Sequence, residues 1–576
     1  MRISSSGISS EGTPLLVSYE GRVIDAQAGD TVASALVHSG ERACRLTAAG
    51  DARGIFCGMG VCHECALVVD GEPGTLACMT PARDGLTVER QPPARLLEAT
   101  ARPSLPEQEV APDLLVLGGG PAGLAAATVA AECGLDVLLV DERAKLGGQF
   151  YKQPAEDFRV DEERLDAQYR DGRALVARAE RAGVKVLKGV RVWGAFQPDH
   201  LLAAGVDVRW TLRPRRLVLA TGAYERGVPM PGWTLPGVMT TGAAQTLLRA
   251  NQVSPGTRVL VSGNGPLNMQ VAAEMARAGV TVVALAELAE LRRPANALAG
   301  LRMASSAPDL IRDGIGYGLS LARARVPVLY GHAVIRMAGD GAVNTATVAR
   351  IDAAGAAVPG TERTFEVDAV CVGFGFLPSN EIARALGCRH RYDEVTGSLV
   401  VERTANGRTS LDRVWVVGDS GGIAGARVAK GVGALAGAAV AADLDRRLPA
   451  QVVAEAVTAE RMRLRNERFQ KALWRAFRAP VLMDQLAEPD TIVCRCESLS
   501  MRDVASAAAA TVGSAGALKR VTRVGMGKCQ GRYCGPVVTA LVAQRSGRHI
   551  DEFGGFAPQV PYKPTEISVV AGAAET

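Results

Sequence analysis

The sequence predicts a multidomain α/β protein, with two Rossmann-like units in tandem at its centre and a small cysteine-rich domain at each end. Three observations support this fold class. A pattern of strand, glycine-rich turn, helix and strand begins at residue 113 and recurs from residue 258. Eight of the twelve cysteines fall into two groups, at 57–78 and 494–534. A chain of 576 residues also exceeds what one hydrophobic core organises, so we expect about three to five folded units.

The composition narrows the classes of function. Hydrophobic residues make up 48% and charged residues 22% of the chain, as in ordinary globular proteins. A net charge of only +5, with 4% aromatic residues and no nucleic-acid motif, argues against DNA or RNA as a partner. We find no apolar signal region at the amino terminus and no uncharged apolar run of about 18 residues, so we expect neither export nor a transmembrane segment. Twelve cysteines without an export signal then favour a cytoplasmic, reducing location in which thiols bind ligands.

The first cysteine group lies in an expected domain at residues 15–98, followed by a Pro/Glu-rich linker at 91–112. Its spacing is C-x4-C-x2-C-x12-C, which is the loop spacing of plant-type ferredoxins, proteins of β-grasp fold that hold a 2Fe–2S cluster. Glycines within the loop leave room for a chain that wraps thiolates round two irons. Structural zinc usually needs two C-x2-C hooks, and one is present here. The expected ligands are Cys57, Cys62, Cys65 and Cys78.

The first Rossmann-like unit, expected at 112–257 and 365–446, has the complete signature of a dinucleotide site. An apolar strand at 114–117 enters a glycine turn, in which Gly118 makes the turn, Gly120 admits the pyrophosphate and Gly123 lets the helix approach the strand. The phosphates then meet the positive end of that helix. Asp141 ends the second strand, where a carboxylate accepts hydrogen bonds from ribose hydroxyls. The expected cofactor-binding residues here are Gly118, Gly120, Pro121, Ala122, Gly123, Asp141, Glu142, Gly148 and Gln149.

Two later segments indicate a flavin as the bound dinucleotide. Thr221 and Gly222 follow a strand at 217–219, and Gly418-Asp419 follows another at 414–417. Both segments, with Gly147-Gly148-Gln149, resemble motifs of glutathione-reductase-like flavoproteins, and that resemblance implies FAD with Asp419 on the ribityl chain. No C-x4-C pair lies near this site, so a disulfide reductase is not expected.

The second Rossmann-like unit, expected at 258–364, has an altered signature. Gly263 and Gly265 keep the first two glycine positions, but Asn268 stands at the third, where a side chain crowds the contact between helix and strand. Glu287 follows the next strand after a slight offset and is the candidate ribose acid. The sequence leaves two readings open: a site for NAD(P)H, or a structural repeat without ligand.

A helical connector is expected at 447–489, before a compact cysteine module at 490–545. The module pairs C-x-C with C-x4-C and has glycines around both hooks, a spacing compatible with 2Fe–2S or with zinc. Residues 493–497 and 522–532 resemble the helical bacterioferritin-associated-ferredoxin-like (BFD-like) module of certain flavoprotein dehydrogenase subunits, which implies a second 2Fe–2S cluster. The expected ligands are Cys494, Cys496, Cys529 and Cys534.

In this order, the modules resemble the larger electron-transfer subunits of hydrogen cyanide synthase, opine oxidase and D-hydroxyproline or proline dehydrogenases, with a ferredoxin domain fused in front. They also resemble part of the alpha subunit of sarcosine oxidase. The most specific segments are 220–226, 371–376 and 526–535. The resemblance implies a hetero-oligomer in which a flavin-dependent, amino-acid-oxidase-like beta subunit oxidises the amine. Electrons then pass through flavin and two 2Fe–2S clusters of this chain to an acceptor that the sequence does not identify. It also implies an FMN between the subunits; some relatives hold NAD or ATP in the first fold in place of FAD.

The sequence offers no candidate for a catalytic acid, base or nucleophile, which agrees with a chain that relays electrons between bound cofactors. One rival hypothesis is a self-contained NAD(P)H-dependent FAD/iron–sulfur oxidoreductase that uses Glu287. A second is a non-enzymatic iron–sulfur carrier without flavin. The remaining cysteines have no ligand spacing and are expected to be buried thiols: Cys44, Cys133, Cys371 and Cys388.

Overall fold

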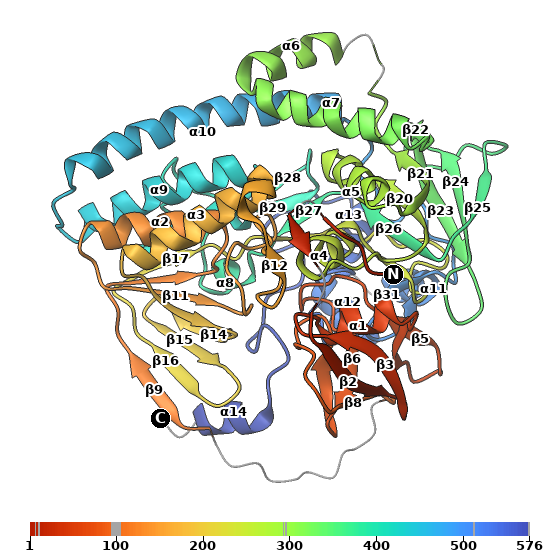
Figure 1. The fold of residues 1–576 in the computed structure, drawn as a ribbon, viewed down its shortest axis with the longest axis horizontal. Coiled ribbons are helices and arrows are strands. Elements are labelled where there is room, and N and C mark those ends of the chain that lie inside the picture. Colours follow the sequence, from red (N-terminus) through yellow and green to blue (C-terminus); the bar gives the residue numbers. More distant parts are fainter. Residues whose placement is uncertain are drawn as a thin grey trace.

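The computed structural model describes residues 1–5, 7–9, 12–93, 105–291, 293, 296–510 and 513–573. Figure 1 shows two α/β units side by side, with the amino-terminal domain below one of them and long helices across the top. No helix within these residues combines the length and the apolar character that a membrane span needs. The expected domain end at 98 and residues 94–104 of the expected linker lie outside the described residues.

The amino-terminal domain is a five-stranded sheet in the order β3-β2-β8-β6-β7 with helix α1 against it. Thr31 caps α1 in a reciprocal pair of hydrogen bonds with Ser34, and the helix begins at Val32. Its strands and helix are β2 Pro14–Tyr19, β3 Arg22–Gln27, α1 Val32–His38, β4 Ala43–Leu46, β5 Ala52–Gly54, β6 Ala66–Val69, β7 Glu72–Leu76 and β8 Leu86–Arg90.

The first unit contains a parallel sheet in the order β13-β11-β10-β17-β30, whose central strand β10 is buried along its whole length. Helices α2 and α9 cover it, and their close contact explains the small residues of α9. A Cβ at Gly433 or Gly437 would lie 2.2 or 2.5 Å from a carbonyl oxygen of α2. The elements are β10 Leu114–Leu117, α2 Pro121–Glu132, β11 Val137–Asp141, α3 Ala167–Arg181, β13 Lys185–Lys188, β17 Arg216–Leu219, β30 Val414–Val416 and α9 Ala426–Asp443.

A four-stranded sheet, β14-β15-β16-β9, flanks this unit. Strand β9 pairs in parallel with β16, although its residues fall in the stretch expected to be a linker. That expectation is therefore wrong at its carboxyl end, because the polar residues of β9 lie on a sheet edge and give no apolar strand signal. The bounds are β9 Glu107–Val110, β14 Arg191–Gln197, β15 His200–Ala204 and β16 Arg209–Leu212.

The second unit is larger than the sequence predicts. Its parallel sheet has the order β19-β26-β20-β21-β22, so strands on either side of 258–364 belong to it. The expected boundaries therefore need correction: they place β19, α4 and β26 in the first unit, because sequence order hides which strands pair. The elements are β19 Val238–Thr240, α4 Thr241–Asn251, β20 Arg258–Gly263, α5 Pro266–Arg277, β21 Thr281–Glu287, α6 Ala297–Ser306, α7 Pro308–Arg323, β22 Val328–Tyr330, β23 His332–Ala338, β24 Thr345–Arg350, β25 Arg363–Glu366 and β26 Ala369–Gly373.

Crossing segments join the two units. Strands β18 and β27 form a two-stranded ribbon, and helix α10 runs across α9 to reach α6 (Figure 1). The carboxy-terminal module has three helices around a short β-ribbon. The bounds are β18 Ala223–Glu225, β27 Phe376–Pro378, α8 Glu381–Ala385, β28 His390–Asp393, β29 Ser398–Val401, α10 Ala450–Ala476, β31 Ile492–Cys494, β32 Leu499–Ser500, α11 Met501–Ala510, α12 Ala515–Thr522, α13 Gly535–Ser546 and α14 Ile567–Ala573, with β1 Ile8–Ser9 paired to β12 Arg159–Val160.

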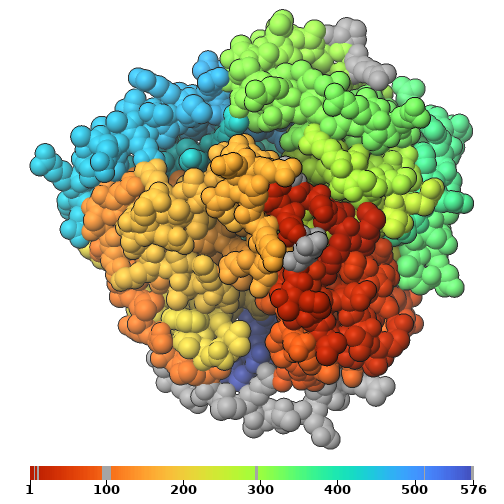
Figure 2. All heavy atoms as spheres, viewed as in Figure 1, coloured from red at the N-terminus to blue at the C-terminus, as the bar shows by residue number. Residues whose placement is uncertain are grey.

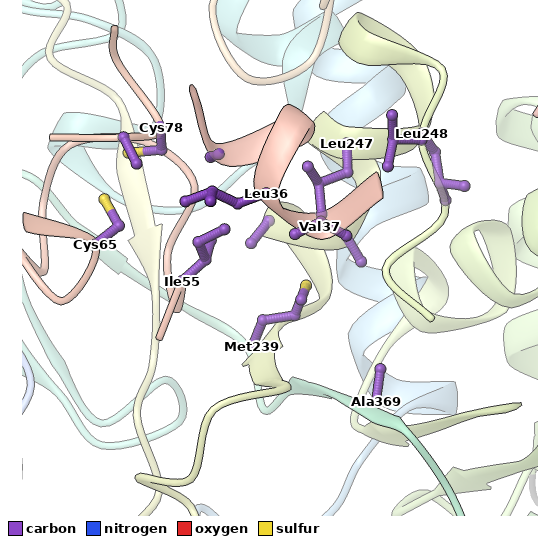
Figure 3. Packing of buried hydrophobic residues seen from close by; sticks show 14 of the residues in the cluster. Leu36, Val37, Ile55, Cys65, Cys78, Met239, Leu247, Leu248 and Ala369 are labelled. Carbon is purple, nitrogen blue, oxygen red and sulfur yellow. The ribbon is translucent and has the colours of Figure 1, made fainter. Parts of the chain in front are cut away.

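The amino-terminal domain shares a core with the second unit. Figure 3 shows Val37 of α1 beside Leu247 of α4, with Leu36 on the side of Cys78 and Ile55. Leu36, Val37, Leu247 and Leu248 are all buried in one cluster. Figure 2 shows the two regions in contact on one face, with carboxy-terminal atoms (blue) between the amino-terminal domain and the first unit. The domain is thus fixed against the core, so the cysteine loop has a defined position there.

Candidate functional site

The amino-terminal cysteine loop is a buried turn whose backbone points at sulfur. The N–H groups of Val61 and Cys62 lie 3.4 and 3.3 Å from Cys57 Sγ, and that of Glu64 lies 3.4 Å from Cys62 Sγ. Gly58 has φ +62°, in the left-handed region. There is no room for a side chain at this position, because a Cβ would lie 2.9 Å from the Cα atom of Ala243 in α4. Donors of this kind stabilise thiolates and tune the clusters that they hold.

The carboxy-terminal cysteines come together from β31, the turn after it, and the start of α13. Cys534 is the N-cap of α13, where the helix terminus favours a thiolate. Gly527 contacts Cys496 so closely that a Cβ would lie 2.2 Å from the cysteine Cβ. Three of these cysteines are buried, and Cys496 is partly exposed.

In both groups the thiols associate in pairs. Hydrogen bonds between sulfur atoms join Cys57 to Cys62 and Cys65 to Cys78 in the first group. In the second group they join Cys494 to Cys534 and Cys496 to Cys529. Although burial raises the pKa of Cys57, its hydrogen bonds bring the value down to about 6; the bond from Cys496 lowers that of Cys529 to about 7.

This pairing fits a binuclear cluster better than a single metal ion. A mononuclear zinc site needs four donors around one point, whereas a 2Fe–2S cluster takes two thiolates on each iron. Within the described ranges, no three Cys, His, Asp or Glu side chains are arranged to hold one metal ion. The donor set in each group, four thiols in two pairs with backbone N–H groups nearby, therefore suits 2Fe–2S. Their role as ligands remains a prediction.

The first nucleotide loop has the geometry that its glycines predict. Gly118 has φ +108°, and a Cβ on Gly123 would lie 1.8 Å from Gly118 O, so α2 starts against the turn. At Gly120, the N-cap of α2, a Cβ would meet nothing closer than Gly148 Cα at 3.8 Å. Gly120 thus faces open space at a helix N-terminus, which is where a pyrophosphate binds.

The acids of this unit lie around the same loop. Asp141 accepts hydrogen bonds from the N–H groups of Gly119 (2.6 Å) and Arg143 (2.7 Å), and burial raises its pKa. Asp419 accepts hydrogen bonds from the N–H groups of Ala424 and Gly425, the two residues just before α9, at 3.0 and 3.1 Å, and burial raises its pKa too. Gly418 contacts Ala122 of α2, so this motif and the glycine loop meet.

Other expected residues have partners within the protein. Thr221 donates to Ser379 O at 2.6 Å, which joins the loop after β17 to the end of β27. Glu142 forms an ion pair with Lys563 of the carboxy-terminal tail. Burial would raise the pKa of Glu142, but Lys563 holds it below the usual range. Gly148 contacts Gly120, and Gln149 O accepts from Lys152 at 2.5 Å.

The motif positions of the second nucleotide loop contact one another through hydrogen bonds. The carboxylate of Glu287 is fully buried and accepts from the N–H groups of Gly265 (3.1 Å) and Ala289 (2.9 Å). A β-bulge between β20 and β21 accounts for the offset seen in the sequence. Asn268 does not push the helix away: its amide donates to Gly373 O at 2.9 Å, and its oxygen accepts from Thr241 at 2.8 Å. Here the side chain fills the space and bonds across it.

The end of α10 covers this second loop. Asn264 donates to Phe477 O at 3.2 Å, and the Trp474 ring is the nearest group to a Cβ built on Gly265, at 3.8 Å. Phe477 is buried in one cluster with Ala289 and Met303. The end of α10 therefore lies over Gly265, which is buried, and no local motif in the sequence signalled this contact.

Sequence reasoning also missed a contact between the two cysteine loops. Glu64, between Cys62 and Cys65, and Arg495, between Cys494 and Cys496, are both buried and lie 3.6 Å apart. A charged residue inside each ligand loop was the only available signal, and local spacing cannot reveal that the two meet. The four cysteines without ligand spacing are all buried, as expected.

Family comparisons agree with this domain order. Residues 12–93 match the family described as 2Fe-2S iron-sulfur cluster binding domain, and residues 112–306 match the pyridine nucleotide-disulphide oxidoreductase family. Residues 488–574 match the sarcosine oxidase A3 domain. The expectations of a ferredoxin-type domain and of a Rossmann-like core are thereby confirmed.

Among known proteins, the chain is similar to the A-type subunit of opine oxidase from Agrobacterium tumefaciens (strain Ach5), with 32% identity covering 80% of this chain and 91% of that protein. It is also similar to the HcnB subunit of hydrogen cyanide synthase from Pseudomonas aeruginosa, with 31% identity over 79% of this chain and 97% of HcnB. The crystal structure of L-proline dehydrogenase from P. horikoshii shares the fold, with a TM-score of 0.70 at 21% identity, covering 97% of this chain and 98% of that one.

Proposed function

This chain belongs to the family of A-type subunits that includes those of opine oxidase and the HcnB subunit of hydrogen cyanide synthase, and we propose that it transfers electrons in a flavin-dependent complex. The complex would oxidise an amino acid, an imino acid or an opine. The observation that carries this proposal is the arrangement of eight thiols as two groups of paired donors, on a core that also has a dinucleotide loop.

The residues of this chain would hold three redox groups. The four cysteines of each loop would bind a 2Fe–2S cluster, and Gly120 at the start of α2 would receive the pyrophosphate of FAD. When bound, flavin and clusters supply the exchange between two-electron and one-electron chemistry. The protein itself fixes their positions, donates N–H groups to sulfur, and excludes water around the buried thiols.

Oxidation of the substrate would take place in another polypeptide. Relatives of this chain are named as subunits of oxidising enzymes, which supports a division of the reaction between two chains. We therefore propose a flavin-dependent, amino-acid-oxidase-like partner subunit, with FMN at the interface as the family resemblance implies. The acceptor of the electrons is a separate component.

The rival function, an NAD(P)H-dependent reductase, requires nucleotide binding in the second unit. Asn264 of this loop donates to Phe477 O, and Trp474 with Phe477 covers the loop. A dinucleotide would have to displace the end of α10 before it reached this loop. These contacts favour the electron-transfer subunit over the reductase.

The test is anaerobic purification of the full chain, followed by assay of iron, acid-labile sulfide and flavin. We expect four irons and four sulfides per chain, which is two 2Fe–2S clusters, together with one FAD. NADH should leave the flavin oxidised, whereas substrate should reduce it only when the partner subunit is present. Cys57→Ser should lower the iron content, and Cys388→Ser, which alters a buried thiol outside both loops, should not. Zinc without sulfide, or rapid reduction by NADH, would overturn the proposal.

A further inference from the structure

The two cysteine loops meet at a buried contact. Phe56 precedes the first ligand of one loop and Tyr533 precedes the last ligand of the other, and their ring centroids lie 5.3 Å apart. Trp233 packs edge-on against Phe56 at 5.7 Å and donates its indole N–H to Ile492 O at 2.6 Å. Aromatic side chains therefore fill the space between the loops and leave no layer of solvent there.

Charged side chains cross the same contact. Arg495 lies over the Phe56 ring at 3.9 Å, donates to Trp233 O at 2.6 Å, and stands 3.6 Å from the Glu64 carboxylate. Only 3% of the Arg495 side chain and 1% of the Glu64 side chain are exposed, so solvent screens them weakly. Arg45 of β4 belongs to the same group, with its guanidinium 3.1 Å from Glu64 and 3.4 Å from Arg495 O. The buried Arg53 also interacts electrostatically with Glu64.

We propose that the two cysteine loops form one redox unit in which the buried Glu64–Arg495 pair joins both centres and sets their potentials together. This inference rests on the proposed function, because it requires a cluster in each loop. An electron that crosses the contact leaves one centre oxidised by one equivalent and the other reduced by one. No covalent bond changes, and no proton has to move.

Position explains why these two charges act on both centres. Glu64 is held in one ligand loop and touches the other, and Arg495 does the reverse. A buried positive charge favours the reduced, more negative form of a centre, and a buried negative charge disfavours it.

Neutral substitutions of Arg495 and Glu64 should shift the reduction potentials of the two centres in opposite directions. Arg495→Gln should shift the reduction equilibrium of both centres about tenfold toward the oxidised form, which is about 59 mV for one electron. Glu64→Gln should shift both toward the reduced form, and Arg495→Lys, which keeps the charge, should stay near the parent. Arg249→Gln is the matched control, because Arg249 is also buried, ion-paired and 4.0 Å above a tyrosine ring, but outside both loops. It should shift neither centre.

The measurement is an anaerobic redox titration of the full holoprotein, followed by electron paramagnetic resonance. Spin counting on the reduced protein should give two spins per chain; one spin or none defeats the proposed function instead. With two spins present, dipolar broadening of the fully reduced spectrum supports the inference, and two independent sharp signals would overturn it. Equal potentials in the parent and both Gln variants would overturn it as well. If Arg495→Gln does not assemble, the sign of the shift in Glu64→Gln decides.

Discussion

Gly120 gives the sharpest test of the first nucleotide site, because it separates binding from folding. In Gly120→Ala the new Cβ would meet only Gly148 Cα, at 3.8 Å, and the backbone at φ −80° suits alanine. Losing a glycine N-cap costs about 0.5–1 kcal/mol. Alanine also lowers the conformational entropy of the unfolded chain, which raises the free energy of unfolding by about 0.4–1 kcal/mol. The free energy of unfolding of the flavin-free protein should therefore stay within about 0.5 kcal/mol of the parent.

Flavin binding should respond quite differently. The methyl group would stand where the pyrophosphate approaches the backbone, and losing one charge-assisted hydrogen bond costs about 1.5–3 kcal/mol. Flavin affinity should fall by about 10- to 100-fold. The matched variant is Gly123→Ala, whose Cβ would lie 1.8 Å from Gly118 O. That overlap displaces α2, and the flavin-free protein should lose about 1–3 kcal/mol of stability.

Two assays are needed. Urea unfolding of the flavin-free proteins gives stability, and equilibrium dialysis with FAD gives affinity. The reasoning fails if Gly120→Ala binds FAD as the parent does, because the dinucleotide then does not pass over Gly120. It also fails if the two variants unfold alike, since the open space at Gly120 would then be contradicted.

Other contacts give further outcomes. Burial raises the pKa of Glu287 from 4.5 to about 8, so the folded protein holds this proton more tightly than the unfolded chain, and stability should fall as pH rises between these values. Urea unfolding of Glu287→Gln at pH 5 and pH 8 should show that this component of the slope has gone; an unchanged slope contradicts the assignment. Gly433→Ala should cost about 1–3 kcal/mol because its Cβ would meet α2. A Cβ at Gly316 in α7 would meet nothing within 4 Å, so Gly316→Ala should raise the free energy of unfolding by up to about 1 kcal/mol. Thermal melts of the two glycine variants test this difference, and equal shifts in melting temperature would refute the packing argument.

Local spacing was enough to predict the backbone geometry of the first glycine loop and the burial of the cysteine groups. The intervals between cysteines, and the distances from Gly118 to Gly123 and to Asp141, are fixed by single turns and by one βαβ unit. Such units fold the same way wherever they occur, so the four-thiol groups and the open face of Gly120 follow from residues close in the chain. The family matches support the same domain order.

Domain limits and the state of the second unit could not be predicted in this way. Strands β19 and β26 belong to the second sheet because β19 pairs with β26 and β26 pairs with β20, and pairing partners lie far apart in sequence. Asn268 reads as an obstacle in the motif but hydrogen-bonds across the helix–strand contact, since Gly373 and Thr241 come to it from elsewhere.

The sequence by itself thus determined the two cysteine groups and the glycine turns, and it predicts what each of them binds. Only the tertiary structure decided which of these sites stay open and which stand together. Trp474 reaches the second nucleotide loop, and Arg495 reaches Glu64, across more than 200 residues of chain in each case. The physical reason is that such contacts depend on how whole helices and domains pack, and periodicity within one segment contains no record of that packing.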